Sequence, residues 1–337
     1  MRQLPSDKKN LLRQRFLTAA KLAVSTVLIY WVFRKFDFGE AWIKLEGIRA
    51  TTILVVFGLS AVQVALLGLR WTLICRWWNS KFAQRHGFST LFAGLFFGQA
   101  MPSSIGGDAI RAFLLFRRYR FSISEAILAT LVDRAVGLVA LLLLATLFAP
   151  SYLALYDTEL GILGWQGAAT VAALVGLGLL ALIAFRIAAR AGFWPRVLGK
   201  ILRALPVVRK AELVPAFVLG ALSHFALLVS AFIWFSEISP GIPISAFFVL
   251  APIGLLLSAL PISIGGWGVR ETSLVFLFTR IDVPAADALL LGLGIGLLSL
   301  AQGLVCGTLW ASAELLRRDR NSDFVKQEPR RRYLPFR

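Results

Sequence analysis

The stretch from Ser258 to Glu271 reads SALPISIGGWGVRE and places helix-breaking residues and two charges inside a long apolar region. A similar stretch lies upstream, because residues Gln99 to Arg111 read QAMPSSIGGDAIR. A constant shift of 159 positions (261 − 102) aligns identical residues, and six of these pairs are Pro102 with Pro261, Ser104 with Ser263, Ile105 with Ile264, Gly106 with Gly265, Gly107 with Gly266 and Arg111 with Arg270. Six matches at one shift indicate an internal repeat, and we expect the fold to be organised around it.

The composition is that of a membrane protein. Hydrophobic residues make up 58% of the 337 residues and charged residues only 16%, and the mean hydropathy is +0.75. Soluble domains average about 45–50% apolar and about 25% charged residues. We therefore predict an all-α, polytopic helical membrane protein with no sizeable soluble domain.

The formal net charge of +18 would suggest a nucleic-acid partner in a soluble protein. In this chain the Lys and Arg residues fall in clusters between apolar blocks, as in the run Arg330 to Arg332. We interpret the clusters as topology signals and as contacts to anionic lipid in the bilayer. We therefore expect lipid partners and no nucleic acid, and the oligomeric state stays open.

Six apolar blocks are long enough to cross a bilayer, which takes about 20 residues of helix. They are Phe16 to Phe33, Thr51 to Ile74, Ala126 to Ala149, Trp165 to Ile187, Leu213 to Phe235, and Ala285 to Leu309. The apolar segments 88–100, 109–116, 244–260 and 272–279 are too short to span, and they flank the two repeated stretches. We predict that they form two re-entrant hairpins, which brings the number of membrane segments to eight.

The basic residues also predict the sides of the membrane. Basic segments are Met1 to Arg15, Arg70 to His86, Arg111 to Arg120, Arg186 to Lys210 and Arg317 to Arg337, whereas Pro150 to Leu163 and Glu237 to Pro243 contain no Lys or Arg. By the positive-inside rule both termini are cytoplasmic. The segment Arg34 to Arg49 is an exception, since it carries four basic and three acidic residues on the predicted outer side. The expected location is the cytoplasmic (inner) membrane of a bacterium.

With these sides, the first hairpin opens from the cytoplasm and the second from the outside. We predict one membrane domain over residues 1–316, with inverted repeats at about 51–149 and 213–311, and a basic cytoplasmic tail at 317–337. Inverted repeats with interrupted helices are typical of transporters whose binding site lies between the repeats.

The hairpin tips have the chemistry of an anion site. Pro and paired Gly should break each helix, so that the second arm starts with free N–H groups and a positive dipole end. Such an end favours phosphate. Ser104 and Ser263 add hydroxyl donors, and Arg111 and Arg270 add guanidinium groups that bind phosphate through two hydrogen bonds. Convergence of both tips would give a doubly basic site. In the alternative, the breakers make only a kink and Arg270 pairs with Glu271.

Asp133 and Arg134 lie inside the span after the first hairpin, where a charge costs about 2.5–3.5 kcal/mol. Adjacent residues in a helix do not face each other, so each needs its own partner. We predict that Arg134 points toward the hairpin cavity and that Asp133 pairs with Arg111 or Arg270. Snorkelling toward the lipid headgroups is the alternative. Asp108 has Trp267 as its counterpart, so the two tips are not chemically equivalent.

Other polar residues carry weaker signals. Cys75 and Cys306 have no metal-ligand spacing and should pack as free thiols. His224 is a lone histidine that should pack or form a hydrogen bond rather than bind metal. The glutamines either line a polar path or bond across helices, and they are Gln63, Gln99 and Gln302. We expect the ten Trp residues to be interface anchors, among them Trp71 and Trp234. No metal or cofactor is expected.

At its two PxSIGGxxxR stretches the chain resembles the transmembrane flippase region of lysylphosphatidylglycerol synthetases and the stand-alone membrane proteins related to it. The likeness runs from the first span to Leu316. It implies translocation of a lipid across the bilayer, with relatives linked to aminoacylated phosphatidylglycerol, polyprenyl-phosphate-linked sugars and hopanoid metabolism. The functional positions it implies are Pro102, Gly106, Gly107, Asp108, Arg111, Pro261, Gly265, Gly266, Arg270 and Glu271. The synthetases carry a soluble aminoacyltransferase domain after this region, and only residues 317–337 follow it here, so we expect no synthase activity.

The leading hypothesis is a flippase for an anionic phospholipid or a polyprenyl-phosphate-type lipid. A membrane glycosyltransferase is a second hypothesis, with Asp37, Glu40 or Glu46 as the general base. Short outer loops and the inverted repeat argue against it. An ion-coupled carrier of a small anion is a third, because the same dipole and arginine chemistry would serve it.

Overall fold

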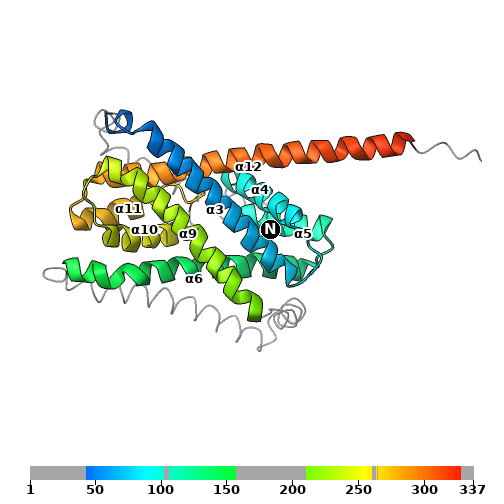
Figure 1. Ribbon diagram of the computed structural model, residues 1–337, viewed down its shortest axis with the longest axis horizontal. Helices are drawn as coiled ribbons and strands as arrows, with labels where there is room; N and C mark the ends of the chain where they lie inside the picture. Colours follow the sequence, from blue (N-terminus) through cyan, green and yellow to red (C-terminus); the bar gives the residue numbers. More distant parts are fainter. Residues whose placement is uncertain (1–42, 102–105, 157–209, 260–262, 264, 328–337) are drawn as a thin grey trace, which may run out of the picture.

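The computed structural model describes residues 43–101, 106–156, 210–259, 263 and 265–327 (Figure 1). Within these residues the chain is helical and has no strand, which confirms the predicted all-α class. The helices are α3 (Ala50–Arg76), α4 (Gln84–Ala100), α5 (Gly106–Arg118), α6 (Ile123–Tyr156), α9 (Lys210–Ile238), α10 (Ile244–Ser258), α11 (Val269–Phe278) and α12 (Ala285–Gln327), with a short 3-10 turn η2 (Thr279–Ile281) after α11.

Four of these helices, α3, α6, α9 and α12, are long and apolar enough to cross a membrane. They contain the spans predicted at 51–74, 126–149, 213–235 and 285–309. The spans predicted at 16–33 and 165–187 lie outside the described residues, as do the chain termini. Helix α6 begins with a capping box, in which the Ser122 N–H donates to Glu125 Oε2 at 2.7 Å and the Glu125 N–H donates to Ser122 Oγ at 3.3 Å.

The helices fall into two units of the same order. In each unit a long helix is followed by two short helices and a second long helix, as α3–α4–α5–α6 and as α9–α10–α11–α12. The second set begins 160, 160, 163 and 162 residues after the first (210 − 50, 244 − 84, 269 − 106 and 285 − 123). This is close to the shift of 159 between the repeated stretches, so the motif repeat coincides with a repeat of helices.

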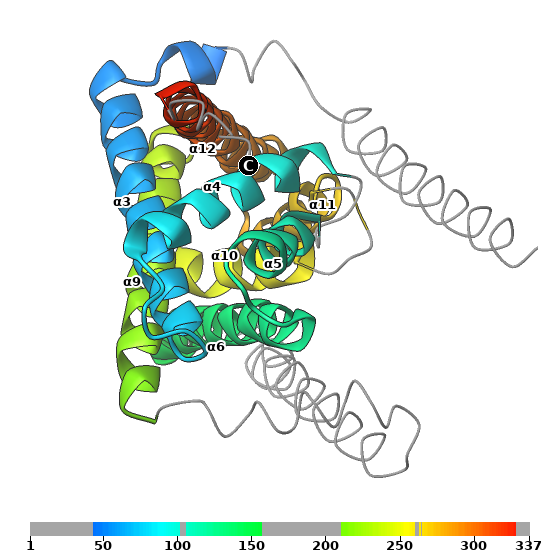
Figure 2. The same cartoon turned by 90° about the vertical axis from the view of Figure 1, so that its right-hand side faces the viewer.

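The two units are packed in opposite directions. The start of α3 contacts the end of α9, where the Arg49 N–H donates to Glu237 Oε2 at 2.9 Å. Further along, Ser230 Oγ donates to the Val56 carbonyl oxygen at 3.3 Å. Since α3 and α9 are counterparts and run antiparallel (Figures 1 and 2), the operation that relates the units reverses the helix direction. Two inverted copies would produce this arrangement.

The units are also intertwined. Helix α6 of the first unit packs on α10 of the second, and α12 of the second unit packs on α4 of the first. The short helices therefore lie between α6 on one side and α12 on the other, as both views show (Figures 1 and 2). Each pair of short helices therefore packs against a long helix of the other unit as well as one of its own.

The short helices form two pairs, α4 with α5 and α10 with α11. At about 1.5 Å per residue none of them reaches across a hydrocarbon core of about 30 Å. In the first pair the backbones touch at glycines, because a Cβ added to Gly107 would lie 2.4 Å from the carbonyl oxygen of Gly94. This close approach sets the position of α5, and with it the positions of Asp108 and Arg111.

The two Gly-Gly pairs of the repeated stretches have different conformations. Gly106 and Gly107 begin helix α5, whereas Gly265 and Gly266 have φ of 58° and 80° and belong to a turn that precedes α11. Gly268 ends this turn with φ 83°. The paired glycines thus have positive φ in the second stretch and not in the first, and in the second stretch glycine avoids the cost that a side chain would incur.

Candidate anion-binding pocket

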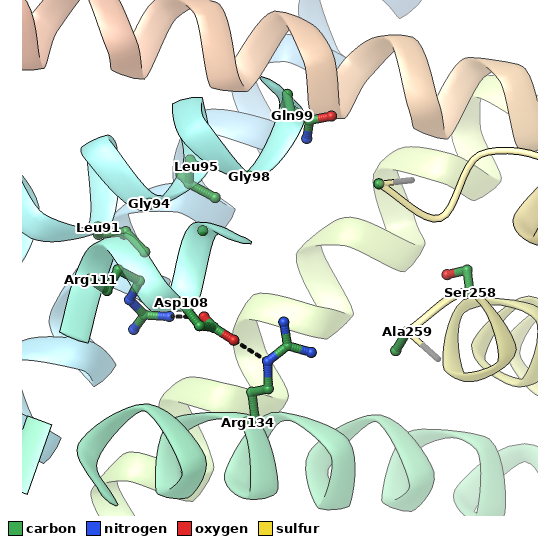
Figure 3. A pocket seen from close by; sticks show the side chains of 12 residues that line it. Leu91, Gly94, Leu95, Gly98, Gln99, Asp108, Arg111, Arg134, Ser258 and Ala259 are labelled. Carbon is green, nitrogen blue, oxygen red and sulfur yellow. Dashed lines mark hydrogen bonds and ion pairs between the residues drawn. The ribbon is translucent and has the colours of Figure 1, made fainter. Parts of the chain in front are cut away.

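A cavity of about 260 Å³ lies where the two units meet (Figure 3). Helix α4 provides one wall, the first turns of α5 a second, and α6 a third, and the end of α10 with the turn before α11 completes the lining. The lining residues are Leu91, Gly94, Leu95, Gly98, Gln99, Gly107, Asp108, Arg111, Arg134, Ser258, Ala259 and Gly265. Residues of both repeated stretches thus contribute to one pocket.

Arg111 is the central cation of this pocket. Its side chain is 8% exposed and comes from the second turn of α5. Nη2 donates to Asp133 Oδ2 at 2.8 Å, and Nη1 donates to Asp108 Oδ1 at 3.2 Å. Its Cζ lies 3.6 Å from the ring centroid of Trp71, which is a close cation–π contact. The predicted pairing of Asp133 with Arg111 is present in the structure.

Asp133 is shared between two arginines. Its Oδ1 accepts from Arg70 Nε at 2.8 Å, and its Oδ2 accepts from Arg111. Asp133 is 4% exposed, so the alternative in which it snorkels toward the headgroups is wrong. Two glycines make room for the Arg70 guanidinium, since a Cβ on either Gly137 or Gly220 would lie only 3.3 Å from Arg70 Nη1.

Arg134 projects from α6 into the pocket, as predicted, and its Nε donates to Asp108 Oδ2 (Figure 3). Its side chain is 37% exposed, against 8% for Arg111. Among the described residues, the linked cluster contains Arg70, Arg111 and Arg134 with Asp108 and Asp133, so three positive charges face two negative ones. An excess cation at membrane depth is costly and is retained where it has a function.

Two donors of the cluster stay unused within the described part of the chain. Arg70 Nη1 and Arg111 Nε are buried and have no hydrogen-bond partner there. A buried donor without an acceptor costs about 1–3 kcal/mol, and more when it is charged. Arg70 does not line the pocket, whereas Arg111 does. Over the described residues, the cluster thus combines an excess positive charge with buried guanidinium donors that have no acceptor there, which is chemistry that favours an anion.

Arg270 lies in a second, separate cluster and does not line the pocket. Its Nε donates to Glu271 Oε1 and to the Gly292 carbonyl oxygen, both at 3.0 Å, and its Cζ lies 4.7 Å from the Trp267 ring centroid. The expectation that both repeat arginines face one doubly basic pocket is therefore wrong. The alternative, in which Arg270 pairs with Glu271, describes the structure.

The start of α11 explains how neighbouring residues pair. Helix α11 begins at Val269, so Arg270 and Glu271 stand in its first turn, where side chains fold back over the preceding turn. Glu271 Oε2 accepts from the Gly268 N–H at 2.6 Å, which holds the carboxylate beside the guanidinium. An acidic residue in a first turn also complements the helix dipole.

The remaining predicted site residues are distributed as follows. Pro102, Ser104 and Pro261 lie outside the described residues. Ser263 is fully buried, and its hydroxyl has no partner within the described part. Gly265 lines the pocket, whereas Gly106 packs against Met101 and Gly266 packs against Ser258.

Sequence reasoning missed Arg70 and misjudged Trp71. Arg70 stands near the end of an apolar span, where it looks like one more cytoplasmic charge, and yet it is 4% exposed. Trp71 was expected to be an interface anchor, but it is fully buried, and its Nε1 donates to Thr90 Oγ1 at 2.8 Å. The only local signal was the adjacency of an Arg and a Trp at a helix end.

The glutamines divide between the two roles considered for them. Gln99 lines the pocket. Gln302 Nε2 donates to Ser60 Oγ at 2.6 Å and to Gln63 Oε1 at 2.9 Å, and so joins α12 to α3. This second arrangement is the cross-helix bonding typical of membrane glutamines.

Metal and disulfide chemistry find no support in the described residues. Cys75 and Cys306 are buried free thiols, as expected. His224 packs near Gly137 on the neighbouring helix α6. In the ranges that the structure describes, no group of three His, Cys, Asp or Glu residues is placed to hold a metal ion.

A larger cavity of about 390 Å³ lies between α3, α9 and α12. Its lining is apolar except for Ser230 and Trp234, and it includes no charged residue. Trp234, expected as an interface anchor, lines this cavity with its Nε1 buried. Of these two cavities, the smaller one has the described side chains that could pair with a charged group.

Comparisons with known proteins agree with this architecture. A UPF0104 membrane protein of Methanothermobacter thermautotrophicus is 26% identical over 165 residues, which cover 49% of this chain and 48% of that protein. The match thus extends over about half of the relative's length. No solved structure matches. The sequence model of the family described as "Lysylphosphatidylglycerol synthase TM region" matches residues 18–307, and the chain belongs to this family of multi-pass membrane proteins.

Proposed function

We propose that this protein moves an anionic lipid, either a phospholipid or a polyprenyl-phosphate-type lipid, between the leaflets of a bacterial cytoplasmic membrane. The lipid phosphate binds in the pocket at Arg111 and Arg134, while the apolar tails stay in the bilayer. The observation that carries the proposal is the excess positive charge of a pocket built from both inverted units.

The chemistry of the pocket supports a phosphate rather than a neutral group. Arg134 and Arg111 present guanidinium donors, which bind phosphate oxygens through paired hydrogen bonds. The first turn of α5 adds the positive end of a helix dipole, since Gly107 and Asp108 line the same pocket. A phosphate there would offset the unbalanced charge of the cluster.

The arrangement of the units supports transport rather than static binding. In transporters with inverted repeats, the site lies between the repeats and opens alternately to either side as one repeat moves against the other. Here the pocket is bounded by α4, α5 and α6 of the first unit and by the end of α10 of the second. Under this proposal α4–α5 and α10–α11 are re-entrant hairpins, and the protein forms no covalent bond.

The test is transport of fluorescent phosphatidylglycerol in vesicles that contain the purified full-length protein. Arg134→Gln removes a charged donor from the pocket, and we expect transport to fall about tenfold or more, because a hydrogen bond to a charged group contributes about 1.5–3 kcal/mol. Arg118→Gln is the matched control, since Arg118 pairs with Glu314 away from the pocket. Equal transport by the wild type and Arg134→Gln would refute the proposal.

Two further arms distinguish the other hypotheses. Uptake of inorganic phosphate without lipid movement would identify a carrier of small anions, which the same arginines would serve. Formation of a labelled glycolipid from a sugar donor would identify a glycosyltransferase. Of the three acidic residues considered for that role, Glu46 is described and precedes α3, while Asp37 and Glu40 lie outside the described residues.

A further inference from the structure

One carboxylate already occupies the pocket. Asp108, in the first turn of α5, accepts from Arg111 Nη1 through Oδ1 and from Arg134 Nε through Oδ2, and so it bridges the two lining arginines (Figure 3). Its side chain is 16% exposed and lies within the lining. Asp133, the other carboxylate of the cluster, lies outside the lining between Arg111 and Arg70.

The two carboxylates therefore have different relations to a ligand. Asp133 accepts a hydrogen bond from Arg111 on the side away from the pocket lining. An anion that enters the pocket need not contact Asp133. Asp108 uses the donors that a phosphate in the pocket would need. Among the described residues, the charged groups of the lining are Asp108, Arg111 and Arg134, so a phosphate finds no other cation there. A phosphate and the Asp108 carboxylate therefore compete for the same guanidinium donors. Two negative charges that share one partly buried pocket repel each other strongly.

We propose that Asp108 is a resident counter-ion, which the phosphate of the lipid displaces from Arg134 and which returns when the lipid leaves. This inference rests on the proposed function and adds the exchange of partners at its site. Arg134 is the partner that changes, because it is the more exposed of the two arginines. Asp133 keeps Arg111 in place throughout.

The exchange explains how the empty pocket can exist at membrane depth. Counted over the described residues, the cluster carries one excess positive charge with Asp108 in place and would carry two without that carboxylate. A pocket with two uncompensated cations would release a phosphate slowly and would be costly to expose without one. Asp108 thus permits the protein to return empty, which net transport requires and which one-for-one lipid exchange does not.

The test compares Asp108→Asn with the wild type in the full-length protein. In detergent, native mass spectrometry measures binding of phosphatidylglycerol, and we expect about tenfold tighter binding by Asp108→Asn, since a competitor for charged donors is removed. In vesicles, net movement of fluorescent phosphatidylglycerol should fall about tenfold. Exchange of labelled for unlabelled phosphatidylglycerol across the same membrane should persist. Asp108→Glu, which keeps the charge, should restore net transport.

The controls separate this mechanism from general damage. Asp287→Asn removes the partner of Lys44, and Glu314→Gln removes the partner of Arg118, both away from the pocket. Neither should change the ratio of net transport to exchange. A structural role for Asp108 would lower net transport and exchange together and would weaken lipid binding, and that result overturns the inference.

A measurement on the wild type keeps the inference testable if Asp108→Asn does not fold. Addition of phosphatidylglycerol should produce an infrared difference band of a carboxylate that loses its arginine partner, and absence of any carboxylate change overturns the inference. If the wild type binds and moves lipid while Asp108→Asn binds no more tightly, the counter-ion role fails and the proposed function stands. If the wild type neither binds nor moves lipid, both fail.

Discussion

The arginine of the repeated motif has two different environments in this protein. Arg111 is held by two aspartates, stacks closely on Trp71 and lines a pocket. Arg270 is held by its neighbour Glu271 and by the Gly292 carbonyl oxygen, and it does not line that pocket. Among the residues that the structure describes, the first cluster has an excess positive charge and the second is neutral. Both units therefore contain the arginine, and under the proposed function the arginine of the first unit binds the anion.

The positions around the two arginines show which residues make this difference. A shift of 159 places Gly292 opposite Asp133 and Trp267 opposite Asp108. Both of these residues still contact Arg270, one through its backbone oxygen and the other through its ring. The same places in space are thus filled by carboxylates in the first unit and by uncharged groups in the second. Glu271, which stands opposite Ala112, supplies the missing negative charge.

The largest expected effect is at Asp133, whose counterpart at the shift of 159 is the uncharged Gly292. Asp133→Asn leaves Arg70 and Arg111 without their shared carboxylate, and we expect a loss of about 3–5 kcal/mol in unfolding free energy. Denaturant unfolding in detergent measures it, with Glu314→Gln, at a partly exposed ion pair with Arg118, as a control expected to change little. A loss below about 1 kcal/mol would show that the first cluster does not depend on this bridge.

Loss of the carboxylate of the second cluster should lower the unfolding free energy but should not change lipid binding. Glu271→Gln leaves Arg270 without its counter-ion, and we expect a loss of about 2–3 kcal/mol. Replacing the pair together, as Arg270→Met with Glu271→Gln, should recover much of this stability, because no unpaired charge remains. Binding of phosphatidylglycerol should be unchanged in the double variant.

This double variant is the most direct test of whether the first cluster alone binds the lipid. A folded Arg270→Met, Glu271→Gln protein that no longer binds or moves phosphatidylglycerol would show that the second cluster takes part in transport. Thermal unfolding and lipid binding measured on the same sample distinguish that result from a loss of folded protein.

The smallest expected effect concerns the aromatic rings under the two arginines. The Arg111 Cζ lies 3.6 Å from the Trp71 ring and the Arg270 Cζ lies 4.7 Å from the Trp267 ring. Trp71→Phe should therefore cost more than Trp267→Phe, by about 0.5–1 kcal/mol in unfolding free energy. The loss of the Trp71 Nε1 hydrogen bond to Thr90 acts in the same direction. Equal losses for the two variants would contradict the difference between the clusters.

Much of the helical framework was predictable because a bilayer imposes a length on apolar segments. The spans at 51–74, 126–149, 213–235 and 285–309 were predicted from hydropathy, and the short segments on either side of the repeated stretches were recognised as too short to cross. The shift between the stretches predicted which helices would correspond. These features depend on properties of contiguous residues, so no knowledge of packing was needed.

The partners of the charged residues were predictable only in part. Asp133 was expected to bind Arg111 or Arg270, and the structure places it with Arg111 and with Arg70, which is 63 positions away in sequence. The two Gly-Gly pairs are identical in sequence, so the sequence did not predict that Gly106 and Gly107 begin a helix while Gly265 and Gly266 form a turn with positive φ. Both outcomes depend on which helices pack together.

By itself, the sequence determined that this is a helical membrane protein built from two related units, since hydrophobic length and motif spacing are local properties. Only the tertiary structure decided that α6 closes on α10 and α12 on α4, and that Asp108 and Arg134 meet in a pocket that Arg270 does not line. The physical reason is that a buried charge is neutralised by whichever opposite charge packing brings within hydrogen-bond distance, and sequence separation does not measure that distance.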